Sequence, residues 1–97
     1  MSLSRTFSVL SDANRRKILD LLKEEEMSVS QLMENFDVTM PTLSHHLDAL
    51  KGVGLVSGRR EGQQIIYSLN LSVFEEIAKT VAGFLDASGS PKSKRKK

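Results

Sequence analysis

The segment from Thr39 to Lys51 constrains the fold most, because it predicts a helix with one apolar face and one small, polar face. Thr39 is placed as its N-cap, Pro41 is tolerated in its first turn, and glycines at 52 and 54 end it. At about 100° per residue the leucines share one side. They are Leu43, Leu47 and Leu50, and the opposite side carries Pro41, His45, Asp48 and Gly52, flanked by Thr42 and Ser44. Such a polar face fits a DNA major groove about 12 Å wide.

The residues before Thr39 predict three further helices. Asp12 is placed to cap the second of them, and Ser28 with Gln31 forms the capping-box pattern that opens the third. We interpret the glutamates at 24–26 as a solvated helix end. The expected spans are Leu3–Leu10, Ala13 to about Lys23, and a short helix after Ser28.

Two short strands and a last helix are expected after Lys51. The strands are predicted at Leu55–Arg60 and Gln64–Leu69, joined around Gly62, which can supply a positive φ. Ser72 and Glu75 match a second capping box, which predicts that the last helix starts there. One face of that helix is apolar and holds Phe74, Ile77, Val81 and Phe84.

This order of elements predicts the fold class. Two short helices joined by a tight turn, the second of them polar on its outer face, precede a hairpin that carries arginines. That is the order of a winged helix-turn-helix. We therefore expect a mainly α protein with five helices and a two-stranded β-hairpin wing.

Charge divides the chain into two parts. Of the 14 basic residues in the 97-residue sequence, five lie in the last six positions, which leaves nine basic against twelve acidic residues elsewhere. Residues 88–97 have nothing to bury, so we expect a disordered basic tail after one domain at residues 1–87. DNA affinity of that domain must then come from a local arrangement of arginine and lysine.

Composition excludes several classes of protein. The chain has no cysteine, which rules out disulfides and thiolate metal sites and fits a cytoplasmic location. No apolar run approaches the roughly 18 residues of a membrane span, and residues 1–5 lack the apolar core of a signal peptide. Ser44, His45 and Asp48 lie on one short helix without oxyanion donors, so we predict no catalytic residue and no enzyme.

Four motifs, in order and correctly spaced, resemble those of the ArsR-type winged-helix repressors, most closely the SdpR-like autorepressor branch. The resemblance covers roughly residues 7–85. The motifs are Asn14-Arg15-Arg16-Lys17-Ile18-Leu19, Pro41-Thr42-Leu43-Ser44-His45-His46-Leu47, Leu50-Lys51-x-x-Gly54-Leu55-Val56, and Arg60-x-Gly62-Gln63-x-x-x-Tyr67-Ser68-Leu69.

The resemblance implies a homodimer formed by the first and last helices, a recognition helix at Thr39–Lys51 and a wing at Leu55–Leu69. By that comparison the residues expected to contact bases, phosphates or the minor groove are Met40, Pro41, Thr42, Ser44, His45, Arg59, Arg60, Gln63 and Gln64. The residues expected at the dimer interface are Leu3, Phe7, Phe74, Ile77, Val81 and Phe84.

Departures from the family pattern concern metal sensing. Arsenic-sensing members carry C-V-C-D-L where this chain has Ser28-Val29-Ser30-Gln31-Leu32, and the last helix has no histidine for a zinc site. His45 and His46 are adjacent, whereas helical zinc pairs are spaced i, i+4. We therefore expect no metal and no other cofactor, and release from DNA through a protein partner, a small ligand or changes in protein concentration.

Two histidines and three basic residues allow more than one role. His45 should face DNA, while His46, at the edge of the leucine face, is expected to be a packed, hydrogen-bonded structural residue. Arg15, Arg16 and Lys17 either approach phosphates or form a solvated helix face, and the sequence does not decide between these roles.

The sequence therefore predicts a dimeric, sequence-specific DNA-binding repressor that occupies a promoter containing an imperfect inverted repeat. The alternative is a winged-helix protein-interaction module without specific DNA binding. Asp48 favours the alternative, because a carboxylate on the outer face is repelled by phosphates unless it meets a cytosine amino group.

Overall fold

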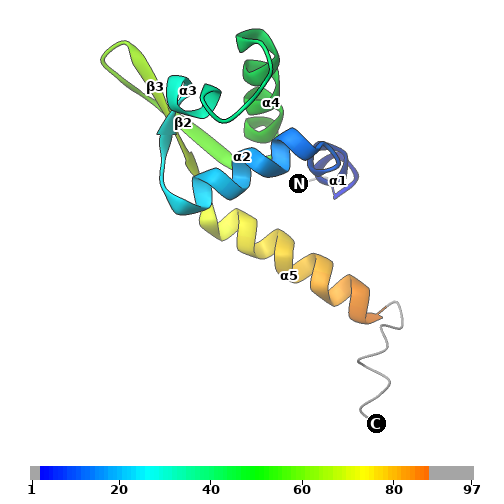
Figure 1. The fold of residues 1–97 in the computed structure, drawn as a ribbon. Coiled ribbons are helices and arrows are strands. Elements are labelled where there is room, and N and C mark those ends of the chain that lie inside the picture. Colours follow the sequence, from blue (N-terminus) through cyan, green and yellow to red (C-terminus); the bar gives the residue numbers. More distant parts are fainter. Residues whose placement is uncertain (1–2, 88–97) are drawn as a thin grey trace.

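The computed structural model describes residues 3–87 and has the predicted mainly helical architecture (Figure 1). Five helices and three short strands follow one another within residues 3–87. They are α1 (Leu3–Leu10), α2 (Ala13–Glu24), β1 (Met27–Ser28), α3 (Val29–Met33), α4 (Met40–Gly52), β2 (Val56–Glu61), β3 (Gln64–Leu69) and α5 (Leu71–Ala87). The predicted tail at 88–97 lies outside the described residues.

Three helices begin at the predicted caps. The Asp12 carboxylate accepts hydrogen bonds from the backbone amides of Asn14 and Arg15 at 2.8 and 3.2 Å. Ser28 and Gln31 form the reciprocal bonds of a capping box. Thr39 accepts from the amide of Thr42 at the start of α4. Each bond satisfies an amide that has no partner within its helix, so these short polar signals set the helix starts locally.

The predicted capping box at Ser72 is wrong. Helix α5 begins at Leu71, so Ser72 lies inside its first turn, and the Phe74 amide donates to the carbonyl of Asn70 at 3.0 Å. Asn70 also donates through its side chain to the Gly54 carbonyl at 2.7 Å. Helix α5 starts before Ser72 because β3 ends at Leu69, and Asn70, which connects β3 to α5, is bonded to the segment that follows α4.

Helix α4 ends at the C-cap residue Val53, and Gly54 follows it in the left-handed region. Gly54 has a φ of +81°, and the amides of Gly54 and Leu55 donate to the carbonyls of Lys51 and Leu50. These two bonds form a Schellman motif, which turns the chain sharply from α4 towards β2. A side chain at Gly54 would be strained at this φ.

The sheet has one strand more than predicted. Strands β2 and β3 form the expected antiparallel hairpin, with Gly62 at a φ of +63° in its turn. The two-residue strand β1 pairs with the other edge of β3, with Met27 opposite Tyr67 and Ser28 opposite Ile66. The strand order is therefore β1-β3-β2. A strand of two residues shows no alternation in sequence, which explains why the pattern did not reveal it.

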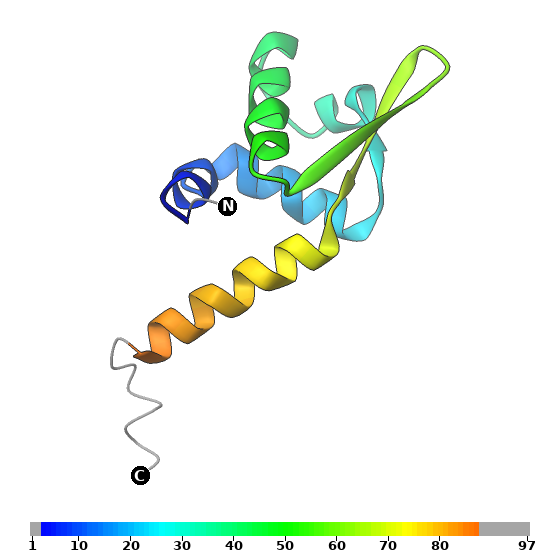
Figure 2. The same ribbon diagram turned by 180° about the vertical axis from the view of Figure 1, so that it is seen from behind.

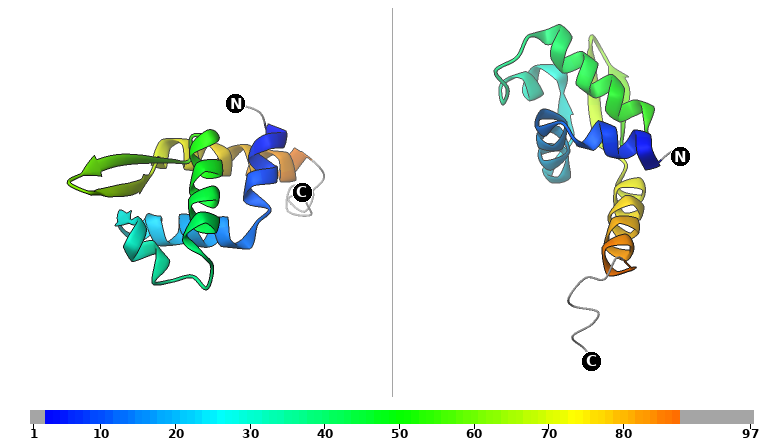
Figure 3. Two further views of the ribbon diagram at one scale, coloured as in Figure 1. Left: turned by 90° about the horizontal axis from the view of Figure 1, so that it is seen from above. Right: turned by 90° about the vertical axis from the view of Figure 1, so that its right-hand side faces the viewer.

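A small leucine-rich core holds these elements together. The three leucines of α4 are fully buried, as predicted, and they pack with Ile18 of α2, Leu32 of α3 and Leu55. Helices α4 and α5 lie on opposite sides of α2, and the β2–β3 hairpin extends beyond α3 (Figures 1 and 2). Helix α5 leads away from the rest of the molecule (Figure 3, right). The core thus presents the outer face of α4 and the hairpin on one side, and much of α5 on the other.

Candidate nucleic-acid interface

The outer face of α4 is exposed along its length. All five residues predicted there to contact DNA are exposed, as is Asp48; the five are Met40, Pro41, Thr42, Ser44 and His45. The residues between them on the inner face are buried: Leu43, His46, Leu47 and Leu50. Helix α4 is therefore anchored by one face and offers hydroxyl, imidazole and apolar groups on the other.

His46 is the structural histidine that the sequence predicted. It is 6% exposed, and its Nδ1 accepts a hydrogen bond from Nε of Arg15 at 3.0 Å. Its Nε2 lies 4.0 Å from a carboxylate oxygen of Asp12. Residues of the N-terminal turn of α2 therefore hold α4 through its buried histidine, while the neighbouring His45 stays exposed.

Asp12 is an ionised cap in this arrangement. Desolvation alone would raise its pKa, but hydrogen bonds from the Arg15 and Asn14 amides, with the charge of Arg15, outweigh it and lower the pKa of Asp12. The carboxylate thus supports both the helix start and the contact between α2 and α4.

The three basic residues whose role was open all have contacts within the subunit. Arg15 bonds to His46, Arg16 donates to the Leu10 carbonyl, and Lys17 donates to the Asn35 carbonyl. Lys17 also lies over the Phe36 ring, 4.8 Å from its centre. These contacts give all three a structural role in α2.

The wing exposes all four of its predicted DNA-contacting residues, which are Arg59, Arg60, Gln63 and Gln64. Adjacent residues of a strand point to opposite faces, so Arg59 and Arg60 leave the hairpin in opposite directions. A Cβ built on Gly58 would lie 3.1 Å from the Tyr67 ring, so Gly58 and Arg60 share the face on which Tyr67 is buried. Arg59 lies on the other face of the hairpin.

Arg59 is held by two carboxylates. Its Nη1 and Nη2 donate to the two oxygens of Glu26 at 3.1 and 2.6 Å, and its Nε and Nη2 donate to Glu61 at 3.0 and 2.8 Å. These hydrogen bonds raise the pKa of Arg59, and the bond from Arg59 lowers the pKa of Glu26. The sequence interpretation of Glu26 as part of a solvated helix end missed this contact, because α2 ends at Glu24 and the partner lies 33 residues away.

The residues predicted for the dimer interface differ widely in exposure. Leu3, Phe7 and Phe84 are 44%, 43% and 65% exposed, whereas Phe74 and Val81 are half-buried. Ile77 is only 6% exposed and belongs to the core of its own subunit. Its burial therefore needs no partner, whereas the family resemblance implied that Ile77 lies at the dimer interface.

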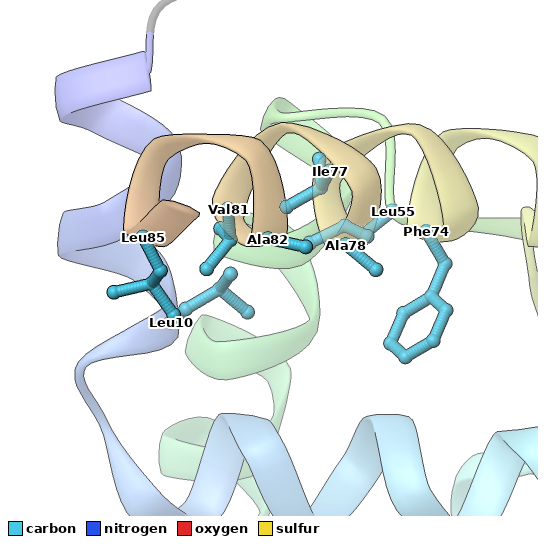
Figure 4. A pocket seen from close by; sticks show the side chains of 8 residues that line it. All are labelled: Leu10, Leu55, Phe74, Ile77, Ala78, Val81, Ala82 and Leu85. Carbon is cyan, nitrogen blue, oxygen red and sulfur yellow. The ribbon is translucent and has the colours of Figure 1, made fainter. Parts of the chain in front are cut away.

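An apolar groove of about 380 Å³ runs along α5 (Figure 4). Its lining comes from α5, the end of α1 and the residue that precedes β2: Leu10, Leu55, Phe74, Ile77, Ala78, Val81, Ala82 and Leu85. Leu85 is 58% exposed and was not among the predicted interface residues, although its adjacency to Phe84 was a signal. The groove offers an apolar surface on the side of α2 away from α4.

Within residues 3–87, no three histidine, aspartate or glutamate side chains come together in a group that could hold a metal ion. None of the helices there is long and apolar enough to cross a membrane.

Comparisons with known proteins agree with this architecture. A sequence model of the arsR family of bacterial regulatory proteins matches residues 12–57. The transcriptional repressor SdpR of Bacillus subtilis strain 168 is 39% identical over 84 residues, which cover 87% of this chain and 93% of that protein. An arsenical resistance operon repressor of Staphylococcus aureus is 40% identical over 75 residues, 77% of this chain and 72% of that one.

A solved structure has the same fold. The homodimeric winged helix-turn-helix DNA-binding domain of a Mycobacterium bovis protein matches with a TM-score of 0.71 and 31% identity, over 88% of this chain and 81% of that one. The matched sequence motif spans α2 to β2, the part that positions the outer face of α4. This chain is a winged helix-turn-helix protein and belongs to the arsR family of bacterial regulatory proteins.

Proposed function

We propose that this protein is a homodimeric, sequence-specific DNA-binding repressor that acts by occupying a promoter. The observation that carries the proposal is the contrast between the two faces of α4. Its leucines are fully buried, while its outer face is exposed. A helix fixed in this way can enter the major groove without disturbing the core. Family membership and the repressor SdpR as a relative support the same function.

The residue types on α4 determine how it reads DNA. Residues 40–48 contain no arginine, lysine, asparagine or glutamine, the side chains that form bidentate bonds to guanine or adenine. Recognition then depends on single hydrogen bonds from Thr42, Ser44 and His45, and on apolar contact of Met40 and Pro41 with thymine methyl groups.

The wing supplies contacts to the backbone or the minor groove. Arg60, Gln63 and Gln64 are exposed near the hairpin turn, and Arg59 must leave its carboxylate partners before it can bind a phosphate. Such contacts add affinity for any sequence. The basic residues at 92–97 act in the same way, as an electrostatic arm outside the described residues.

The homodimer forms through α1 and α5 in this proposal. Both helices expose large apolar side chains, namely Leu3 and Phe7 on α1 and Phe84 and Leu85 on α5, and the apolar groove lies between them. A twofold axis through this surface places two α4 helices roughly 34 Å apart, which predicts an imperfect inverted repeat as the binding site. The inducer that releases DNA is a protein or a small ligand in this proposal, and the protein acts in the cytoplasm as a non-enzymatic regulator.

A second candidate is a winged-helix module that binds another protein through α4. The exposed Asp48 favours it, because this carboxylate lies on the face that would approach phosphates. Specific DNA binding and protein docking differ in their response to salt, since DNA binding releases counterions and weakens steeply as salt rises.

Selection from random duplexes, followed by a salt titration on the selected site, tests the proposal. We expect a palindromic consensus and an affinity that falls steeply with salt. Failure to enrich any sequence, together with binding that is independent of salt, would favour the protein-interaction module.

A further inference from the structure

We infer that Glu26 limits the affinity of the wing for DNA by holding Arg59 in an ion pair that a DNA phosphate must displace. This inference rests on the proposed function and adds an affinity-determining residue that lies outside both the recognition helix and the wing. Glu26 precedes β1, in the connection that follows α2.

The contact uses every nitrogen of the Arg59 guanidinium group. Nη1 and Nη2 bond to the two oxygens of Glu26, in the parallel arrangement that an arginine also forms with a phosphate. Nε and Nη2 bond to one oxygen of Glu61. A phosphate that approaches Arg59 therefore finds four of its five N–H donors already engaged by two carboxylates.

The third strand brings Glu26 to the wing. Arg59 of β2 lies opposite Ile66 of β3, and Ile66 lies opposite Ser28 of β1. The chain entering β1 thus passes beside the face of the hairpin that carries Arg59. The pairing of β1 with β3 therefore brings Glu26 within hydrogen-bond distance of Arg59, although the two residues are 33 positions apart.

Local charge also opposes DNA. Arg59 is accompanied by Glu26 and Glu61, so this face of the hairpin carries a net negative charge. All three side chains are about half exposed, with relative exposures of 49%, 48% and 57%. Exposed ion pairs contribute little net stability, so a phosphate can displace Glu26, but the two carboxylates remain within a Debye length of it. The ion pair therefore weakens DNA binding without abolishing it.

The test compares two substitutions with the same change in net charge. Glu26→Gln removes the carboxylate that holds Arg59, and Glu25→Gln removes the exposed carboxylate beside it, for which the structure shows no side-chain partner among the residues it describes. Binding is measured by fluorescence anisotropy with a labelled random-sequence duplex and with the selected site. We expect the Glu26→Gln variant to bind both duplexes about threefold to tenfold more tightly than the Glu25→Gln variant does, because the effect occurs once in each of the two subunits of the dimer.

A double-mutant cycle identifies Arg59 as the cause. In an Arg59→Gln background, Glu26→Gln should change the affinity no more than Glu25→Gln does. Glu26→Gln alone should raise the affinity with little change in the salt dependence, because Arg59 releases the same condensed ion from DNA in the parent once the phosphate has displaced Glu26. Glu61→Gln provides a second variant, with a smaller expected gain because Glu61 engages Arg59 through one oxygen.

The outcomes separate the inference from the proposed function. Equal affinities of Glu26→Gln and Glu25→Gln would overturn the inference, as would weaker binding by Glu26→Gln, which would mean that the ion pair positions the wing. Neither outcome affects the proposed function. If the parent and every variant fail to bind both duplexes, the proposed function is refuted and the inference with it.

Discussion

Replacing Ile77 with alanine should destabilise the subunit, whereas replacing Phe84 with alanine should weaken association between subunits. The two side chains share the apolar stripe of α5, but Ile77 is 6% exposed and Phe84 is 65% exposed. Ile77 packs with the core that includes Leu55, while Phe84 lies about two turns further towards the C-terminal end of α5.

The magnitudes follow from these exposures. Ile77→Ala removes three buried carbon atoms, at about 0.8 kcal/mol each, and leaves a cavity, so we expect a loss of about 3 kcal/mol in the free energy of unfolding. For a domain of this size, that corresponds to a fall in Tm of about 12–24 °C. Phe84→Ala removes a ring that is mostly exposed in the subunit, so it should cost the subunit less than about 1 kcal/mol but weaken the dimer by about 2 kcal/mol, or roughly 30-fold in Kd.

Sedimentation equilibrium gives the dimer Kd, and thermal unfolding at several protein concentrations gives the stability, because the Tm of a dimer depends on concentration. Lys79→Ala, an exposed change on the same helix, is the control and should alter neither quantity. The reasoning would be refuted if Ile77→Ala dissociated the dimer without lowering the Tm of the dilute protein, or if Phe84→Ala left the Kd unchanged.

Four further predictions concern the capping, the histidines and metals. Asp12→Ala should lower the free energy of unfolding in urea by about 1 kcal/mol. Because folding lowers the pKa of Asp12, the carboxylate contributes its full stability above the unfolded pKa near 3.8, and this contribution is lost as the pH falls below that value. An unchanged acid transition in the variant would contradict this role. His46→Leu should lower the free energy of unfolding by about 1–3 kcal/mol, because it leaves Arg15 without its acceptor. His46→Gln should restore part of that stability. Equal stability of the two variants would exclude the hydrogen bond as the cause. His45→Ala should cost about 1–3 kcal/mol on the selected site and little on random DNA, and an equal loss on both would remove His45 from base recognition. Micromolar Zn²⁺, Ni²⁺, Co²⁺ or Cu²⁺ should not release the selected DNA relative to a chelator control; a reversible tenfold shift, about 1.4 kcal/mol of coupling, would reveal a metal effector.

Much of the fold was predictable because its signals are local. Asp12, Ser28 and Thr39 cap helices by bonding to amides two or three residues away, so the sequence alone locates these helix starts. Gly62 allows the hairpin turn through its own φ. The leucine spacing of α4 likewise separated its buried face from its exposed face, and with it the candidate DNA-contacting residues.

A contact between distant residues overrode the local signal for the start of α5. Ser72 and Glu75 match a capping box, but the helix begins at Leu71 because β3 delivers the chain to Asn70, whose side chain bonds to the Gly54 carbonyl. A local pattern of about 1 kcal/mol is readily overridden by contacts that fix where the preceding strand ends.

Only the tertiary structure decided the contacts between distant parts of the chain. The sequence predicted a bonded His46 but not Arg15 as its partner, and it gave no sign that Glu26 would reach Arg59, since these pairs are 31 and 33 residues apart. Ile77 and Phe84 likewise carry the same helical signal, yet one is buried and the other exposed. Periodicity defines which face of a helix is apolar, whereas burial depends on what that face meets, and this is determined by how the other elements pack around it.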